Sequence, residues 1–140
     1  MNNQVIKQAG LKITLPRVKI LEILEESHGH LSAEDVFKIL LGKKEDIGLG
    51  TIYRVLTQFE GVGLIKRHHF ETGQAVFELE RGVHHDHLVC IKCGRIEEFM
   101  DNMIEARQDT IAKQHGFKLK DHSLTLYGIC NHGKCDGEKI

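Results

Sequence analysis

The sequence predicts an α+β protein of two small domains, on the basis of three observations. Helical periodicity with clear stop signals fills the first sixty residues, two short alternating runs follow, and the pattern then changes to strands around one helix. After a first short helix, three helices are followed by a two-stranded hairpin, which is the order of a winged helix-turn-helix domain. We therefore predict a winged-helix domain over residues 1–81, a hinge at about 80–83 and a small α/β domain over residues 84–140.

End signals mark the first three helices. Gly10 ends the first short apolar face. Thr14 is placed to cap the second helix, which has a proline in its first turn. The third helix begins at Ser32-Ala33-Glu34-Asp35, which resembles a capping box, and ends at Gly42.

The fourth helix has the clearest amphipathic pattern. We expect it to open at Gly50 and Thr51, with a core stripe at spacings of i, i+3, i+4 and i+7: Ile52, Val55, Leu56 and Phe59. Its opposite face carries hydrogen-bond donors and one aromatic ring: Tyr53, Arg54, Thr57 and Gln58. Strands over 64–68 and 75–79, joined by a turn at Thr72-Gly73, complete the wing.

The second domain has a different pattern. We predict a strand over 84–91, a turn at Cys93-Gly94 and a strand over 95–99. Asp101 is placed to cap a helix that ends at Gly116, and 117–130 is a strand-rich run in which apolar and polar residues alternate. Each half is too small for a deep core, so a bound metal ion and a dimer interface are reasonable additions.

Composition favours a globular cytoplasmic protein. Hydrophobic residues make up 41% and charged residues 28% of the chain, and no apolar run approaches the roughly 20 residues of a membrane span. We expect no membrane partner. The net charge of −1 does not indicate a nucleic-acid partner, but residues 1–20 carry four bases and no acid. Such a local basic patch can follow a phosphate backbone, or can be an ordinary solvated face.

The four cysteines form two close pairs, Cys90 with Cys93 in CIKC and Cys130 with Cys135 in CNHGKC. In a reducing cytoplasm such pairs are more often metal ligands than disulfides. They can supply four tetrahedral thiolates at about 2.3 Å from zinc, and a closed shell leaves no open position for catalysis. We predict a structural zinc site; the alternative is four unrelated buried cysteines.

A run of potential ligands, His84-His85-Asp86-His87, opens the second domain. Side chains alternate along a strand, so His84 and Asp86 point to one face while His85 and His87 point to the other. One strand can therefore serve two metal sites. Candidate further ligands follow it: Glu97, Glu98, Glu105 and His122. The alternative is a polar rim without metal, with His122 a satisfied core histidine.

Seven stretches over almost the whole chain resemble the ferric uptake regulator family: GLKITLPR, HLSAEDVF, GLGTIYRVLTQFE, VFEL, HHDHLVCIKCG, IEARQ and HSLTLYG. The resemblance implies that the four cysteines bind a structural zinc. It implies a regulatory site formed by His30, Glu78, His85, His87 and Glu98, and an additional site formed by His84, Asp86, Glu105 and His122. This division agrees with the alternation of the strand.

The resemblance also implies a homodimer that represses genes by binding duplex operator DNA, and it leaves open whether two dimers associate. The family's recognition helix corresponds to 51–61, and its lysine that enters an A·T-rich minor groove corresponds to Lys12. The expected DNA-binding residues are Lys12, Arg17, Thr51, Tyr53, Arg54 and Thr57. A regulatory ion that joins His30 to ligands of the second domain would fix the angle between the domains, and with it the spacing of the two recognition helices.

Both carboxylate positions of the implied regulatory site are glutamates, Glu78 and Glu98, whereas peroxide-sensing members tend to have aspartates. Zinc-sensing members usually add a cysteine to this site, and all four cysteines here are assigned to the structural zinc. The comparison favours ferrous iron as the signal for repression of iron-uptake genes. Zinc, manganese and cobalt suit the same donors and can replace iron in vitro; zinc-, manganese- or peroxide-sensing members are the alternatives.

Two other classes of protein are less consistent with the sequence. A metal-dependent enzyme would need an open coordination position and a placed acid or base, and the chain has no HExxH helix or nucleophile motif. A metal-storage protein would not need the Tyr53/Arg54 helix. We therefore do not expect an enzyme.

Overall fold

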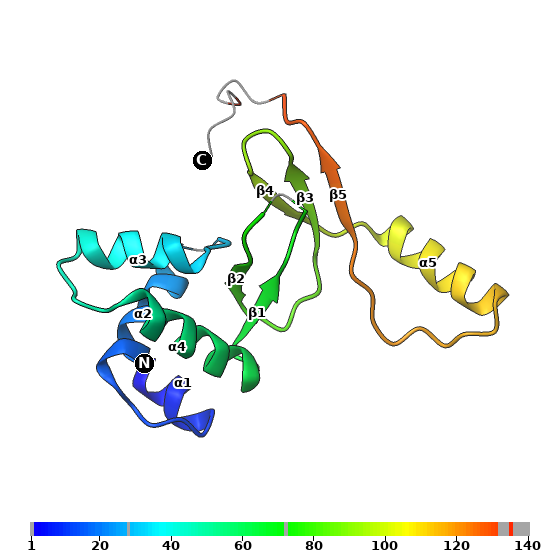
Figure 1. Ribbon diagram of the computed structural model, residues 1–140. Helices are drawn as coiled ribbons and strands as arrows, with labels where there is room; N and C mark the ends of the chain where they lie inside the picture. The colour runs from blue at the N-terminus through cyan, green and yellow to red at the C-terminus, as the bar shows by residue number, and fades with distance from the viewer. Residues whose placement is uncertain (1, 28, 72, 132–134, 136–140) are drawn as a thin grey trace. The chain divides into compact units, whose positions relative to one another are not determined.

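The computed structural model describes residues 2–27, 29–71, 73–131 and 135. The chain divides into two compact units, Met1–Gly82 and Val83–Ile140. The first unit contains four helices and a hairpin, and the second contains three strands and one helix (Figure 1). No helix in the described part of the chain is both long enough and apolar enough to cross a membrane.

The helices of unit 1 are α1 (Asn2–Gln8), α2 (Leu15–Ser27), α3 (Ala33–Gly42) and α4 (Leu49–Gly61). The predicted capping box of α3 is present: the Ser32 side chain accepts from the Asp35 amide, and the Asp35 carboxylate accepts from the Ser32 amide. Gly10 follows α1 with a φ of +87°, a conformation that favours glycine. These signals were local, which is why the sequence located them well.

The wing consists of β1 (Ile65–His68) and β2 (Val76–Leu79), which pair antiparallel with Ile65 opposite Leu79. Leu31 adds a two-way backbone bridge to Phe77 on the other side of β2, at 2.7 and 3.0 Å. This bridge brings the segment before α3, which contains His30, next to β2. Thr72 of the predicted turn lies outside the described residues.

A single apolar cluster holds unit 1 together. All four members of the predicted stripe on α4 are buried, and they pack with residues of α1, α2, α3 and both wing strands. Burying a large aliphatic or aromatic side chain contributes about 1.5–3 kcal/mol. The stripe therefore fixes which face of α4 is left for solvent or a partner.

The sheet of unit 2 has the order β4–β3–β5, from β3 (Asp86–Cys90), β4 (Ile96–Phe99) and β5 (Thr125–Gly128). β3 pairs antiparallel with β4 and parallel with β5, so it lies in the centre (Figure 1). Asp101 is the N-cap of the helix α5 (Asn102–Gln114), as predicted, and its carboxylate accepts from the amides of Met103 and Ile104.

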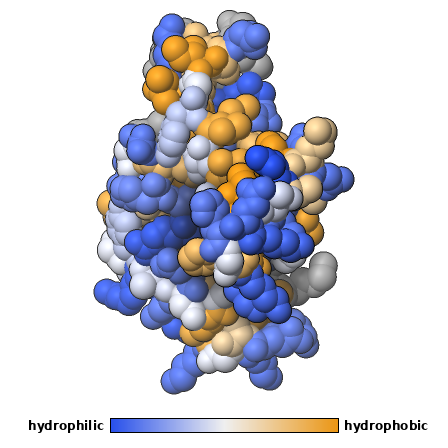
Figure 2. Space-filling model, turned by 90° about the vertical axis from the view of Figure 1, so that its right-hand side faces the viewer, coloured by the Kyte–Doolittle hydropathy of each residue, from blue (hydrophilic) through white to orange (hydrophobic). Residues whose placement is uncertain are grey.

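Unit 2 buries little apolar surface. Its buried hydrophobic residues, within the described ranges, are Val89, Cys90, Cys93 and Ala112. Several large apolar side chains remain exposed instead: Leu88, Ile111, Phe117, Leu126 and Ile129. Figure 2 shows hydrophobic residues exposed in patches at the surface, among hydrophilic ones. Such exposure in a small unit is typical of an interaction surface.

Several predicted boundaries differ from the observed ones, by one residue at the starts of β1, β2 and β4 and by more at β3 and β5. The strand expected over 84–91 is β3, so His84 and His85 precede it, and the strand-rich run 117–130 contains only the four residues of β5. The four pairs of the β3–β5 ladder set the length of β5, because β3 is its neighbour in the three-stranded sheet. His122 therefore lies before the last strand. The helix α4 begins at Leu49 rather than Gly50, because the extended Gly48 is its N-cap and accepts from the Ile52 amide.

Candidate metal centres and DNA-binding surface

The four cysteine sulfurs come together in unit 2. Their Sγ atoms all lie within 4.8 Å of one another, with Cys90 3.5 Å from Cys135 and Cys93 3.7 Å from Cys130. None of the four forms a disulfide. A tetrahedron with zinc–sulfur distances of about 2.3 Å has edges of about 3.8 Å. The spacing therefore fits one zinc ion with four thiolate ligands.

Two backbone amides stabilise a thiolate at the Cys90 position of this site. The amides of Cys130 and Cys93 each donate to the Cys90 sulfur at 3.4 Å, and they lower the pKa of Cys90 to about 5. The neighbouring sulfurs, Cys130 first, and burial raise the pKa of Cys135 to about 12. Four crowded thiols cannot all ionise together without a cation, and a divalent ion supplies the charge that they need.

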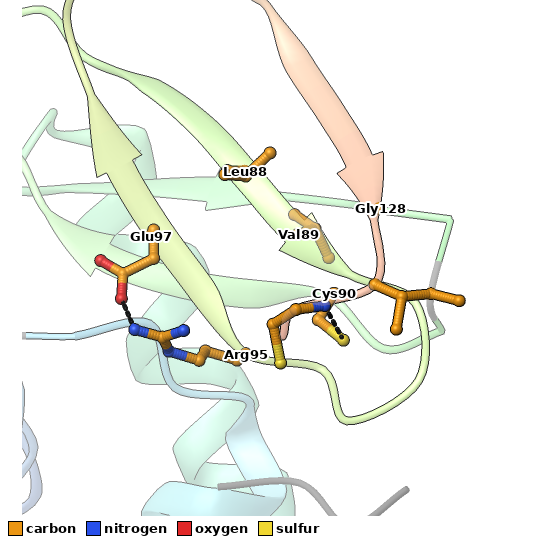
Figure 3. Close-up of a pocket in the computed structure, with 8 residues that line it drawn as sticks. Leu88, Val89, Cys90, Arg95, Glu97 and Gly128 are labelled. Atoms are coloured by element: carbon orange, nitrogen blue, oxygen red, sulfur yellow. Dashed lines mark hydrogen bonds and ion pairs between the residues drawn. The ribbon is translucent and has the colours of Figure 1, made fainter. Parts of the chain in front are cut away.

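A small pocket of about 100 Å³ lies beside Cys90 in unit 2 (Figure 3). Leu88, Val89 and Gly128 line it, and the ion pair between Arg95 and Glu97 lies at its edge. Glu97 was a candidate ligand in the sequence. Its carboxylate is paired with Arg95 and belongs to none of the possible metal-binding groups among the described residues.

A second cluster in unit 2 joins His84, Asp86, Glu105 and His122. The Nε2 atom of His84 lies 3.2 Å from Asp86 Oδ1 and 3.2 Å from Glu105 Oε1. The Nε2 atom of His122 lies 3.3 Å from each of the same two oxygens. The loop before β3, the strand itself, α5 and the segment before β5 each contribute one residue.

The geometry of this cluster fits a cation better than a hydrogen-bond network. The four atoms approach closely and are buried, but none has a hydrogen-bond partner in suitable geometry within the described ranges. The same holds for the second oxygen of Asp86. Buried polar atoms without partners are costly unless an ion or water satisfies them. Tetrahedral nitrogen and oxygen ligands at about 2.0 Å have edges of about 3.3 Å. Two carboxylates with two neutral imidazoles also match the charge of a divalent ion.

A third set of predicted ligands is divided between the two units. In unit 1, His30 Nε2 lies 2.8 Å from Glu78 Oε2, and both side chains are almost fully buried. In unit 2, His85 Nε2 lies 3.3 Å from Glu98 Oε2, and the rings of His85 and His87 are 4.9 Å apart. Glu98 is directly opposite His87 in the β3–β4 ladder. Each unit thus places its own share of the predicted regulatory ligands together.

His68 is a residue that the sequence interpretation missed. Its Nε2 lies 2.7 Å from Glu78 Oε1, so each oxygen of Glu78 has its own histidine neighbour. His68 also stacks on Phe70, with ring planes only 3° apart. The hairpin register could have found this contact, because diagonal neighbours on one face of a ladder lie within reach of long side chains, and Glu78 is diagonal to His68.

Gln108 was missed as well. Its Oε1 atom is buried and has no hydrogen-bond partner among the described residues; it lies one helical turn beyond Glu105 on α5. The i, i+3 spacing on one helix face was the available signal.

The predicted DNA-binding residues lie on unit 1. Lys12 and Arg54 are exposed, and the structure gives neither side chain an ion pair or hydrogen bond with any residue it describes. Tyr53 is exposed on α4, where its hydroxyl donates to Glu34 at 3.0 Å; this hydrogen bond raises the pKa of Tyr53. Thr51 lies in the first turn of the same helix, and Thr57 accepts from Arg67 at 3.4 Å.

A winged helix with exposed cationic side chains, joined to a unit built around thiolate and imidazole–carboxylate clusters, defines a metal-binding DNA-binding protein. The family model for the "Ferric uptake regulator family" matches residues 8–127. A "Ferric uptake regulation protein" from Legionella pneumophila is 63% identical over 129 residues, which cover 91% of this chain and 95% of the relative. This chain belongs to the ferric uptake regulator family.

Solved structures agree with this assignment. The Vibrio cholerae ferric uptake regulator superposes with a TM-score of 0.86 at 54% identity, covering 93% of this chain and 100% of that chain. A ferric uptake regulator from Francisella tularensis, solved with iron, superposes with a TM-score of 0.83 at 43% identity, covering 87% and 93%. The predicted fold class, an α+β protein with an N-terminal winged helix-turn-helix domain followed by a small α/β dimerisation domain, is confirmed. Members of this family are transcriptional regulators rather than enzymes.

Proposed function

We propose that this protein is an iron-responsive repressor that binds operator DNA when its regulatory ligands hold Fe²⁺. The observation that carries the proposal is the buried pair of His30 and Glu78 in the DNA-binding unit, at 2.8 Å. An imidazole and a carboxylate are good ligands for a divalent ion, but two ligands do not complete a coordination shell. The remaining ligands, His85, His87 and Glu98, come from unit 2.

The ion held by this set is Fe²⁺ in the cell. Imidazole and carboxylate donors alone also suit zinc, manganese and cobalt, so the donor set does not select iron by chemistry. Support for iron comes from the two glutamates, from the absence of a fifth cysteine in the sequence, and from the iron in the Francisella tularensis relative. Metal availability then decides which ion is bound.

The ligands perform the switch by holding both units in one arrangement. His30 and Glu78 connect the ion to the winged-helix domain, and His85, His87 and Glu98 connect the same ion to the second domain. A dimer reads two half-sites only when its recognition helices are spaced to match the grooves. For the ion to favour the DNA-binding arrangement of the domains, it must bind that arrangement more tightly than the others, by about 1–3 kcal/mol or more.

The other two clusters serve the fold of the second domain. Cys90, Cys93, Cys130 and Cys135 hold a structural zinc. The His84, Asp86, Glu105 and His122 cluster holds an additional divalent ion within the same domain. Exposed apolar residues such as Phe117 and Ile129 form the homodimer interface, and a dimer, or a pair of dimers, binds the operator in the cytoplasm.

DNA is bound by a face of unit 1 that carries Lys12, Thr51, Tyr53, Arg54 and Thr57. Arg17, which is half-buried, belongs to this surface through its hydrogen bonds to the Lys12 carbonyl and to Gln58. Lys12 enters an A·T-rich minor groove, while Tyr53 and Arg54 on α4 lie in the major groove. Basic side chains release counterions from the phosphates they neutralise, so binding weakens as salt rises.

A DNA titration with and without metal tests the proposal. Duplexes selected from a random pool by the wild-type dimer should bind at least tenfold more tightly with saturating Mn²⁺, as an oxidation-resistant substitute for Fe²⁺, than after chelation. His87→Ala should lose this response and keep its zinc. Equal affinity with and without metal in the zinc-replete dimer would refute metal-responsive binding.

A further inference from the structure

The guanidinium of Arg17 is held by hydrogen bonds to two other segments of the DNA-binding unit. It is half-buried near the start of α2, and three of its N–H groups donate to other parts of unit 1. Nε and Nη2 both donate to the side-chain oxygen of Gln58 on α4, at 3.2 and 2.9 Å. Nη1 donates to the backbone carbonyl of Lys12 at 2.7 Å.

These contacts connect two elements that are far apart in sequence. Lys12 lies in the loop between α1 and α2, while Gln58 lies in the last two turns of α4. The other hydrogen bonds of the loop lie at its two ends: the amides of Gly10 and Leu11 donate to the carbonyls of Lys7 and Ile6 at 3.0 and 3.2 Å, and the Val18 amide donates to the Thr14 carbonyl at 3.0 Å. Arg17 therefore supplies the short hydrogen bond that fixes the carbonyl of Lys12.

We propose that Arg17 is a positioning residue that holds the Lys12 loop against the recognition helix, and does not itself neutralise a phosphate. The inference rests on the proposed DNA-binding surface, in which Lys12 and α4 contact adjacent grooves. Insertion into both grooves at once requires a fixed distance between the loop and the helix. The forked guanidinium group can hold this distance constant, because its N–H donors lie in one plane at fixed angles and bind both the loop and the helix.

The contact also fixes the amide of Gln58. Both hydrogen bonds from Arg17 end on Oε1, so the carbonyl faces Arg17 and only the NH₂ group remains to meet DNA. Gln58 cannot then contact adenine through its carbonyl and amide together, which is the usual bidentate mode of glutamine. This makes the role of Gln58 dependent on Arg17.

Salt dependence separates positioning from phosphate contact. Removing one phosphate contact lowers the slope of log affinity against log salt by about 0.9, whereas removing a positioning hydrogen bond lowers affinity at every salt concentration. We expect Arg17→Ala to weaken binding of a selected A·T-rich duplex about tenfold in Mn²⁺, with an unchanged slope. Arg54→Ala, the direct-contact comparison, should reduce both affinity and slope.

Two further variants make the test strict. Arg17→Lys keeps the charge and loses the fork, so it should resemble Arg17→Ala; near-wild-type affinity for the lysine variant would overturn the proposal. Gln58→Ala should weaken binding, and the double variant with Arg17→Ala should be no weaker than Arg17→Ala alone. Additive losses would mean that the two residues act independently and would also overturn it.

Failure of the DNA surface itself has a different signature. If Lys12→Ala and Arg54→Ala both bind like wild type, the proposed surface is wrong, whatever Arg17 does. If they weaken binding, the surface stands, and a slope reduced by about 0.9 in Arg17→Ala would assign Arg17 to a phosphate instead. Unchanged thermal unfolding and zinc content in each variant would show that the winged helix remains folded.

Discussion

Replacement of Cys93 by serine should unfold the second domain while leaving the winged helix intact. Cys93 is 2% exposed, and its sulfur lies 3.7 Å from that of Cys130, so serine leaves three thiolates and a poor hydroxyl ligand. Unit 2 has few buried apolar side chains to compensate, whereas unit 1 has a continuous core. The two units should therefore respond very differently to loss of the ion.

The magnitude follows from mass action. An ion present at 100 to 1,000 times its dissociation constant stabilises the state that binds it by about 2.7–4.1 kcal/mol. Loss of at least that amount is a large fraction of the stability of a small domain, which is about 5–15 kcal/mol. Amide hydrogen exchange followed by mass spectrometry should show lost protection after residue 83 and retained protection in α2 and α4. Zinc content should fall in parallel.

A matched control separates ligand loss from simple destabilisation. Val89→Ala removes a fully buried side chain next to Cys90 and should cost about 2 kcal/mol through a cavity, with zinc retained. If the Cys93→Ser protein keeps both its zinc and the protection of unit 2, the four-sulfur site is wrongly assigned. If it loses zinc but not protection, the site is not structural.

Three further predictions concern the clusters. His87→Ala should abolish metal-dependent DNA binding in a zinc-replete dimer, whereas His84→Ala should mainly lower the melting temperature of the second domain. Calorimetric metal titrations followed by DNA titrations measure both effects. If His84→Ala abolishes the metal response and His87→Ala keeps it, the two strand faces are wrongly assigned. His68→Ala should weaken metal binding at the regulatory ligands about 10–100-fold, because it removes one of the two histidine partners of Glu78. His68→Gln should restore part of this affinity. Zinc affinity, measured by chelator competition, should rise from pH 6 to pH 8. Cys135, whose pKa is raised to about 12, must lose its proton when zinc binds, whereas Cys90, whose pKa is about 5, is already ionised. A zinc affinity that does not change with pH would contradict this prediction.

Local signals in the sequence located most of the helices. The capping box at Ser32, the N-cap at Asp101 and the buried stripe of α4 depend on residues within one or two turns, and each appears where predicted. Strand lengths depend on partners instead. The run before Cys130 alternates well beyond β5, but β3 pairs with only four of its residues.

The same distinction applies to the sites. Strand alternation separated His84 and Asp86 from His85 and His87 without any knowledge of partners. The contact between His68 and Glu78 required the hairpin register, and the hydrogen bonds of Arg17 required the packing of α2 on α4. The sequence placed Arg17 with Lys12 as an expected DNA contact, and only the tertiary structure shows that three of its five N–H groups already donate to Gln58 and Lys12.

The chemistry of the three donor sets suggests why one protein would bind several ions. Four thiolates form a closed, soft site whose ligands all belong to the second domain, so its occupancy changes the stability of that domain but cannot report on the domain arrangement. The His84 cluster likewise draws all four ligands from one unit. The proposed regulatory set alone, among these three, takes ligands from both units and contains no sulfur. Its harder, mixed donors bind ferrous iron reversibly, and only a set of ligands divided between two domains can convert that binding into a change of domain arrangement.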